Sequence, residues 1–132
     1  MSAGETRFDP ESHPGFAIMA AMFGEERVRA RAEAEAAHPD GRRMNEVLRD
    51  FAYGRVWNND ILTPRERSLI TVALLAGLGR DNELKAHIKG ALRNGCTLSE
   101  LHEVMVHLTL YCGFPAGLGG QRMLQSMPTE EL

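Results

Sequence analysis

This sequence has little cysteine and no excess of positive charge. It contains two cysteines among 132 residues, and its formal net charge at pH 7 is -3. A chain without a broad basic surface is a poor candidate for binding nucleic acid or anionic lipid. Cys96 and Cys112 do not form the Cys-x-x-Cys pair of a redox centre. We therefore expect two free structural thiols and no nucleic-acid partner.

Long apolar runs are also missing. The apolar segment Leu69–Leu78 is interrupted by Thr71 and is far shorter than the roughly 20 residues that a membrane-crossing helix needs. No apolar secretory region opens the chain, and no stretch alternates with period two for long enough to predict a strand. We expect a reduced, cytoplasmic, all-α protein with no membrane partner.

The remaining composition is that of an ordinary globular protein, with 43% apolar and 25% charged residues. The length fits one domain with one core, which we assign to residues 1–132. Residues 1–14 are polar, contain two prolines and show no period. They predict an arm that is flexible or laid over a partner. The rest of the chain predicts about six helices.

The first half of the chain predicts helices on both sides of one turn. Residues 15–37 mix apolar side chains with an Ala/Glu/Arg run that is typical of a solvated helix face. Pro39-Asp40-Gly41 marks the turn. The next apolar residues recur at i, i+3, i+4 and i+7, which predicts one buried helix face: Met44, Val47, Leu48 and Phe51. Tyr53 and Trp57 share a face at i, i+4 and are expected in the core or in a pocket wall.

Thr63–Leu78 is the predicted centre of the fold. Thr63 stands at the helix cap, Pro64 at the first helical position, and Glu66 three residues after the threonine. Thr63 and Glu66 can then satisfy each other's backbone donors in a capping box, which gives Glu66 a structural explanation. The helix that follows is apolar on all sides and has to be covered on all sides. We expect the rest of the chain, or a neighbouring subunit, to cover it.

Three more helices are predicted after the central one. Gly77 and Gly79 can take the left-handed conformation that ends the central helix, and Asp81 or Asn82 can cap the next helix. A second capping box opens a helix over residues 97–112. The last helix, residues 115–127, is rich in glycine, which favours close packing against a neighbouring helix.

His87 is the most informative polar side chain. It lies beside the apolar stripe of its helix, and Glu83 stands one turn before it. A carboxylate at this position favours the charged imidazolium and can fix the orientation of the ring. A histidine beside an apolar face is more often structural than catalytic, so the residues alone leave both possibilities open.

Several basic residues flank these two helices, and most are expected to be solvated. Arg80 stands at the corner between the helices, where its guanidinium can bind a carboxylate through two hydrogen bonds. His102 and His107 are five positions apart and do not share a face as i, i+4 metal ligands would. We therefore expect no metal site. The residues by themselves predict an acid–base histidine near arginines and name no reaction.

Five motifs follow one another between Leu62 and Gly117: T-P-R-E-R, E-L-x-x-H, A-L-x-N-G-x-T, E-x-x-E-V-x-x-H and Y-x-G-x-P. In this order they resemble the carboxymuconolactone decarboxylase family. Tyr53-Gly54-x-x-Trp57 and the earlier FGEERVRARAEA are similar to its γ-carboxymuconolactone decarboxylase branch. The resemblance implies an all-α unit like that of alkylhydroperoxidase D, which assembles into rings with pockets at subunit boundaries. A homotrimer or homohexamer is therefore expected.

One side of this family reduces peroxides through Cys-x-x-Cys-x-x-x-His. The matching positions here read Arg80-x-x-Glu83-x-x-x-His87, so the histidine is kept and the thiols are absent. Glu66 resembles the family's upstream glutamate, with a spacing that differs by a residue or two. Because a peroxide is reduced by a thiolate nucleophile, the departure argues against a thiol peroxidase.

The other side of the family converts 4-carboxymuconolactone to 3-oxoadipate enol-lactone in the protocatechuate branch of β-ketoadipate catabolism. The resemblance implies this decarboxylation, with a small carboxylated lactone as partner. It also implies no metal or organic cofactor, because the lactone itself accepts the electrons. Two alternatives to this activity remain. The protein acts on another small carboxylated or lactone-like substrate, or it is a non-enzymatic, stress-related helical oligomer.

The resemblance also suggests roles for individual residues. We predict that His87 donates a proton to the intermediate and is held in place by Glu83 or Glu66. Four residues are predicted to bind substrate, the arginines through a carboxylate and the aromatic residues as pocket walls that exclude water: Arg80, Arg67, Tyr53 and Trp57.

Overall fold

The computed structural model describes residues 7–127, without the side chain of Ala36. The chain divides into two compact units, Met1–Ile61 and Leu62–Leu132, and each has its own cluster of buried apolar side chains. The assignment of residues 1–132 to one domain stays a prediction. All regular elements of the described residues are helical, which confirms the all-α fold. None of these helices has both the length and the apolarity that crossing a membrane requires.

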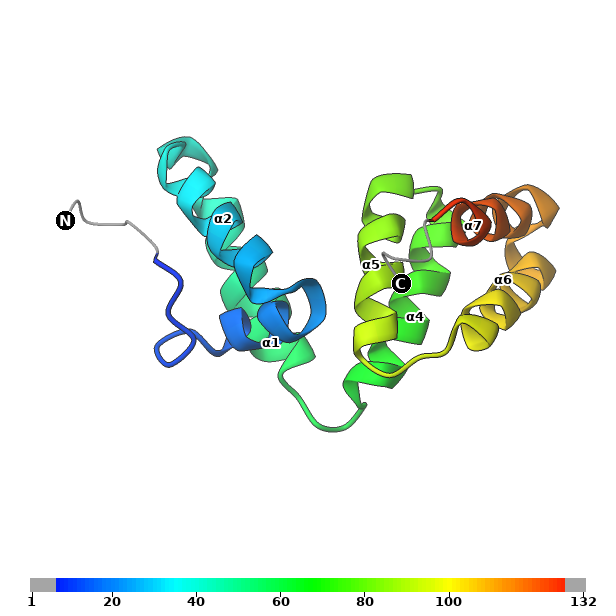
Figure 1. Ribbon diagram of the computed structural model, residues 1–132, viewed down its shortest axis with the longest axis horizontal. Coiled ribbons are helices and arrows are strands. Elements are labelled where there is room, and N and C mark those ends of the chain that lie inside the picture. The colour runs from blue at the N-terminus through cyan, green and yellow to red at the C-terminus, as the bar shows by residue number, and fades with distance from the viewer. Residues whose placement is uncertain (1–6, 128–132) are drawn as a thin grey trace. The chain divides into compact units, whose positions relative to one another are not determined.

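The first unit is a set of short helices (Figure 1): α1 (Pro14–Phe23), α2 (Glu25–Ala36), η1 (Pro39–Gly41), α3 (Arg42–Glu46) and η2 (Val47–Trp57). Gly24 separates α1 from α2 with a φ of 95°, a conformation that glycine adopts without a steric cost. The region predicted over residues 15–37 is therefore two helices. The described residues contain seven α-helices, where about six were predicted.

The core of the first unit lies between α1, α2 and η2. Its buried side chains are Phe16, Met19, Met22, Val28, Ala32 and Tyr53. Gly15 allows α1 to touch η2, because a Cβ there would overlap the carbonyl oxygen of Arg49. Phe8 packs on Phe16 with ring centroids 5.2 Å apart, so part of the predicted arm lies on this core. Residues 1–6 of that arm are outside the described residues.

The predicted buried face over residues 44–51 is wrong. Met44, Val47 and Phe51 are 73%, 49% and 56% exposed, whereas Arg49 is buried. The physical reason is that η2 is a π-helix, whose hydrogen bonds join residues i and i+5. A spacing of 3.6 residues therefore no longer gathers side chains on one face. Arg49 is compensated by Asp50, which accepts hydrogen bonds of 2.6 and 2.5 Å from its guanidinium.

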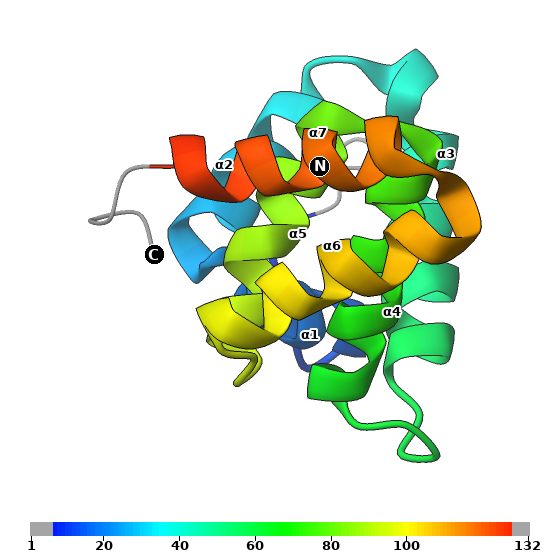
Figure 2. The ribbon, with the colours of Figure 1, turned by 90° about the vertical axis from the view of Figure 1, so that its right-hand side faces the viewer.

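The second unit contains the four helices that the sequence predicted most directly: α4 (Pro64–Leu78), α5 (Asp81–Arg93), α6 (Leu98–Cys112) and α7 (Phe114–Ser126). α4 and α5 lie side by side (Figure 1). α6 and α7 also pack on each other (Figure 2), and Gly113 joins them. Both predicted capping boxes are present, Thr63 with Glu66 and Thr97 with Glu100. The core between these helices includes Val72, Leu84, Ile88, Leu101, Met105 and Leu124.

Glycines in α7 allow it to pack closely on α6, as predicted. A Cβ at Gly117 would overlap the hydroxyl oxygen of Thr109 and lie 2.9 Å from the carbonyl oxygen of Met105. A Cβ at Gly120 would overlap the sulfur of Met105. The missing side chains therefore set the distance between the two helices.

The central helix α4 is not covered on all sides by the described residues. Val72 and Ala76 are buried, but Ile70, Leu74 and Leu78 are 47%, 60% and 70% exposed. These three residues recur every fourth position and form one apolar face. The sequence pattern thus predicted the apolarity of the helix correctly, but the residues that the structure describes leave this face of it exposed.

Candidate functional site

The helical hairpin α4–α5 carries most of the predicted site residues. Gly79 ends α4 with a φ of 70°, and the backbone N–H of Arg80 donates to the carbonyl of Leu75 at 3.0 Å. At the other end, the side-chain amide of Asn94 donates to the hydroxyl of Ser68 at 3.0 Å. These two contacts show that the helices are antiparallel. Arg80 occupies the N-cap of α5, so the predicted cap at Asp81 or Asn82 is wrong.

His87 lies on the side of α5 that faces α4. It is seven residues after Arg80 and seven before Asn94, and seven residues complete two helical turns to within about 20°. Because Asn94 reaches Ser68 on α4, His87 projects in nearly the same direction. Glu83 is one turn before His87, as predicted. The hairpin therefore places Arg80, Glu83 and His87 along one edge of α5.

Burial decides the charge of His87. The imidazole is half-buried, and burial lowers the pKa of His87 below its ordinary value, while the negative charge of Glu83 raises it. Glu83 therefore acts in the predicted direction but is outweighed by burial. The neutral imidazole is favoured at neutral pH until another negative charge approaches.

Arg67 lies on the same side of the hairpin as Glu83. On α4 it is turned away from Val72 and Ala76, which fill the core, and on α5 Glu83 is turned away from the buried Ile88. Arg67 is half-buried and Arg80 is exposed. Arg67 and Glu83 are thus both turned away from the core, whereas His87 lies beside the buried Leu84 and Ala91 on its helix.

Glu66 is held at the far end of the hairpin. Its carboxylate accepts the backbone N–H of Thr63 at 2.9 Å, and its own N–H donates to the Thr63 hydroxyl at 3.1 Å. These hydrogen bonds lower the pKa of Glu66. The neighbouring contact of Ser68 with Asn94 places this end about two turns, or 10 Å, from the level of His87. Of the two carboxylates predicted to hold His87, Glu83 is the nearer, because it is one turn from His87 on α5, whereas Glu66 is at the far end of the hairpin on α4.

Tyr53 and Trp57 belong to the first unit, where their rings pack with centroids 5.8 Å apart. Tyr53 also meets the edge of Phe23 at 5.9 Å, and burial raises its pKa to about 12. The shared face that their spacing predicted is confirmed. Their role as walls of the pocket at His87 stays a prediction.

Both cysteines are free, as predicted. Cys96 is buried, and its thiol makes a long contact of 3.5 Å with the carbonyl of Arg65. Burial raises the pKa of the Cys96 thiol, which keeps it protonated and unreactive. Cys112 is exposed at the end of α6.

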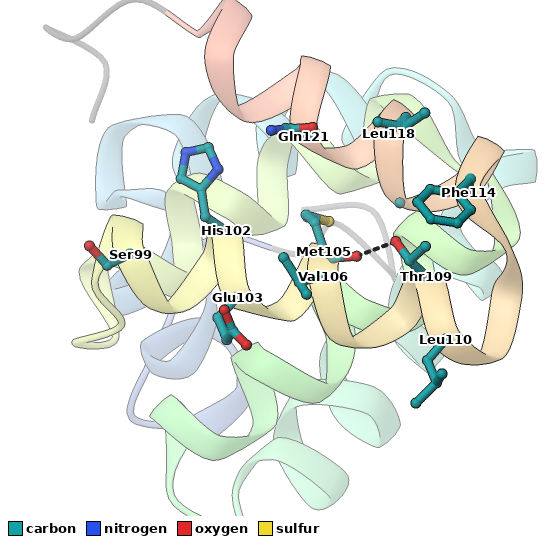
Figure 3. A pocket seen from close by; sticks show the side chains of 11 residues that line it. Ser99, His102, Glu103, Met105, Val106, Thr109, Leu110, Phe114, Leu118 and Gln121 are labelled. Atoms are coloured by element: carbon teal, nitrogen blue, oxygen red, sulfur yellow. Dashed lines mark hydrogen bonds between the residues drawn. The ribbon is translucent and has the colours of Figure 1, made fainter.

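A groove that the sequence did not predict lies between α6 and α7 and has a volume of about 930 Å³. Figure 3 shows His102 and Gln121 towards one end and Phe114 towards the other. Val106, Leu110 and Phe114 are 63%, 76% and 71% exposed. The spacing of Val106 and Leu110 on α6 was the available signal, since it marks a second apolar face on a helix whose other face fills the core. Phe114 is the first residue of α7. No predicted site residue lines this groove.

Residues 43–120 match the sequence model of the carboxymuconolactone decarboxylase family. The chain is 40% identical to the 4-carboxymuconolactone decarboxylase of Acinetobacter baylyi over 77 residues, 58% of each chain. It is 38% identical to the nitrosuccinic acid decarboxylase npaB of Metarhizium robertsii over 80 residues, 61% of this chain and 56% of that protein.

A third relative is peroxisomal protein 2 of Schizosaccharomyces pombe, which is 32% identical over 71 residues. That match covers 51% of this chain and 33% of the relative. The chain thus spans less than two thirds of the length of each of these relatives.

Proposed function

This chain belongs to the carboxymuconolactone decarboxylase family, and we propose that it decarboxylates a small carboxylated substrate, 4-carboxymuconolactone in particular. The observation that carries the proposal is the edge of α5, where the Arg80 corner, Glu83 and the half-buried His87 follow one another. The similarity to a 4-carboxymuconolactone decarboxylase supports the choice of substrate. The product is 3-oxoadipate enol-lactone.

The proposed reaction needs no electron-accepting cofactor. The bond between the ring and the carboxylate carbon breaks and releases carbon dioxide. Its electron pair passes through the ring alkene to the lactone carbonyl, and a proton then adds to carbon. The protein has to bind the carboxylate, stabilise the developing negative charge and deliver the proton.

His87 is the proposed proton donor. Its lowered pKa favours the neutral ring in the free protein, and an anionic substrate favours the protonated ring because opposite charges attract. Substrate binding would therefore charge the imidazole when it is needed. Glu83, one turn away on the same helix, is the proposed orienting carboxylate.

Arg80 and Arg67 are the proposed carboxylate ligands. Both stand on the hairpin that carries His87, one at its corner and the other on α4. A guanidinium can donate two parallel hydrogen bonds to a carboxylate, which fixes the substrate as well as neutralising it. This arrangement orients the departing carboxylate while His87 faces the carbon that receives the proton.

The names of two relatives support a common chemistry. One decarboxylates a lactone and the other nitrosuccinic acid. A lactone carbonyl and a nitro group both withdraw electrons from a neighbouring carbanion, so either substrate can serve as its own electron acceptor. Family members can therefore share a proton donor and cationic groups while the pocket selects the substrate.

The direct test is to supply the purified protein with 4-carboxymuconolactone and measure carbon dioxide release. We expect His87→Gln to lower kcat by at least about 100-fold, because positioned general acids contribute on this scale. His107→Gln is the matched control, since His107 is exposed and its ring packs on Tyr111 of the same helix. Circular dichroism checks that both variants fold. Turnover by His87→Gln at the wild-type rate would exclude His87 as the acid.

Nitrosuccinic acid supplies the competing substrate in the same assay. A higher kcat/KM for nitrosuccinic acid than for the lactone would make nitrosuccinic acid the preferred substrate. The proposal that the chain is a decarboxylase would still hold. Release of carbon dioxide from neither compound would contradict the proposal and favour a helical oligomer without catalysis.

We also propose that the chain forms a homo-oligomer, a trimer or a hexamer. Two apolar surfaces of the second unit support this: the α4 face of Ile70, Leu74 and Leu78, and the groove between α6 and α7. Large exposed apolar surfaces are uncommon on monomers and mark interaction sites. A second copy of this chain is the proposed occupant of the groove.

A further inference from the structure

The hydrogen bond between Ser68 and Asn94 is the one side-chain link between α4 and α5 for which the described residues give a distance. Ser68 is completely buried on α4, and its hydroxyl accepts the side-chain amide of Asn94 at 3.0 Å. Burying a hydroxyl carries a desolvation cost, and a single neutral hydrogen bond contributes little net stability. An apolar pair could fill the same space, so stability alone is a weak explanation for this polar contact.

The position of this bond relative to His87 suggests a second role. α5 is joined to α4 near its start by the Arg80 N–H on the Leu75 carbonyl, and at its end by Asn94 on Ser68. His87 is midway between these two anchors, seven residues from each. The first of these bonds caps the end of α4 at the turn, and the second holds the end of α5, so both restrict sliding and rotation of α5 on α4. A shift at one anchor would move the imidazole relative to the groups on α4.

Such a shift would matter for chemistry more than for folding. Proton transfer depends on the donor being within hydrogen-bond reach of the acceptor, and displacements of about 1 Å can cost 100-fold in rate. Apolar contacts between Leu84, Ile88 and Val72 hold the helices together but are not directional. The hydrogen bond is directional and can set the register that apolar packing leaves loose.

We propose that Ser68 and Asn94 are positioning residues, whose hydrogen bond fixes the register of α5 on α4 and thereby places His87 for proton transfer. This inference rests on the proposed decarboxylation only for its kinetic consequence. Its geometric consequence, a change in the surroundings of His87, does not depend on which substrate is used.

The kinetic test uses Ser68→Ala, Asn94→Ala and the double variant with 4-carboxymuconolactone. We expect each single variant to lower kcat by about tenfold with little change in KM, because binding groups stay and alignment is lost. The double variant should lose no more than the larger single loss, because both changes remove the same bond. Ser126→Ala is the matched control, since its hydroxyl donates to the carbonyl of Met123 within α7.

A second measurement separates this inference from the proposed function. The imidazole of His87 is identified by NMR through the signals that His87→Gln removes, and its titration is followed in each variant. We expect the titration midpoint to rise in Ser68→Ala and Asn94→Ala, because a loosened helix lets water reach the ring, and to stay unchanged in Ser126→Ala. This readout holds even if the wild-type protein releases no carbon dioxide.

The outcomes are distinct. A shifted titration with a lowered kcat supports the inference, and a shifted titration in a protein without turnover supports it while contradicting the decarboxylase proposal. Loss of thermal stability with an unchanged His87 titration and an unchanged kcat would show that the bond is only structural, and would overturn the inference.

Discussion

At the scale of single residues, the behaviour of His87 follows from competition between burial and charge. Burial lowers the pKa of His87, and Glu83 opposes this effect without cancelling it. A base whose pKa is lower in the folded protein binds a proton more readily when the chain unfolds. The folded protein is therefore more stable when the ring of His87 is neutral than when it is protonated, so the free energy of unfolding depends on pH.

We predict that the free energy of unfolding decreases as pH falls from above the ordinary histidine pKa of 6.5 through the lower pKa of folded His87. The unfolded chain binds the extra proton in this window, so acidification favours unfolding. Urea titrations at a series of pH values measure the effect. His87→Gln should flatten the dependence in this window; equal slopes in the wild type and in His87→Gln would contradict the assignment.

The two thiols provide a second prediction at this scale. Cys96 is buried with a raised pKa, and Cys112 has no second cysteine near it in sequence. We expect Cys96→Ser with Cys112→Ser to keep decarboxylation within about threefold of wild type, since no step of the proposed reaction uses a thiolate. The same protein should reduce no peroxide with or without these changes. Peroxide reduction that disappears in the double variant would restore the peroxidase hypothesis.

At the scale of elements, features set by neighbouring residues could be predicted from the sequence, whereas features set by contacts between helices could not. Both capping boxes were predictable because the cap and its partner are three residues apart in the sequence. The π-helix η2 was not predictable, because its apolar residues also fit a regular α-helical pattern. Contact with α1 through Gly15 accompanies the altered winding, and that contact joins residues far apart in sequence.

The glycines of α7 give a test of helix packing. We predict that Gly117→Ala destabilises the fold by about 1–3 kcal/mol, because its Cβ would overlap the Thr109 hydroxyl and press on the Met105 carbonyl. Gly119→Ala is the matched control in the same helix, with no atom within 4 Å of its Cβ. It should be neutral or stabilising by up to about 1 kcal/mol, since alanine favours a helix. Equal effects in urea unfolding would argue against close packing at Gly117.

At the scale of the whole molecule, apolar surface remains after each unit has formed its core. The α4 face and the groove between α6 and α7 both expose large apolar side chains. Water in contact with such surfaces disfavours an isolated chain, and association with further copies removes that contact. This is the physical basis of the proposed homo-oligomer.

We predict that Leu110→Glu converts the oligomer to smaller species, because it places a charge in the groove where Leu110 is 76% exposed. Ile61→Glu is the control, at a residue that is 83% exposed and outside the groove. Sedimentation equilibrium measures the mass of each protein. A monomeric wild-type protein would contradict the oligomer, and an oligomer unaffected by Leu110→Glu would place the interface elsewhere.

The sequence by itself determined the helical class, the two capping boxes, the glycine-containing corner between α4 and α5, and the position of Glu83 one turn before His87 on the same helix. Each of these depends on residues that are within about one helical turn of each other. The tertiary structure decided what long-range contacts control: the exposed face over residues 44–51, the groove between α6 and α7, and the Ser68–Asn94 bond between α4 and α5. Burial and register depend on which helices pack together, and residue spacing within one helix does not specify its partner.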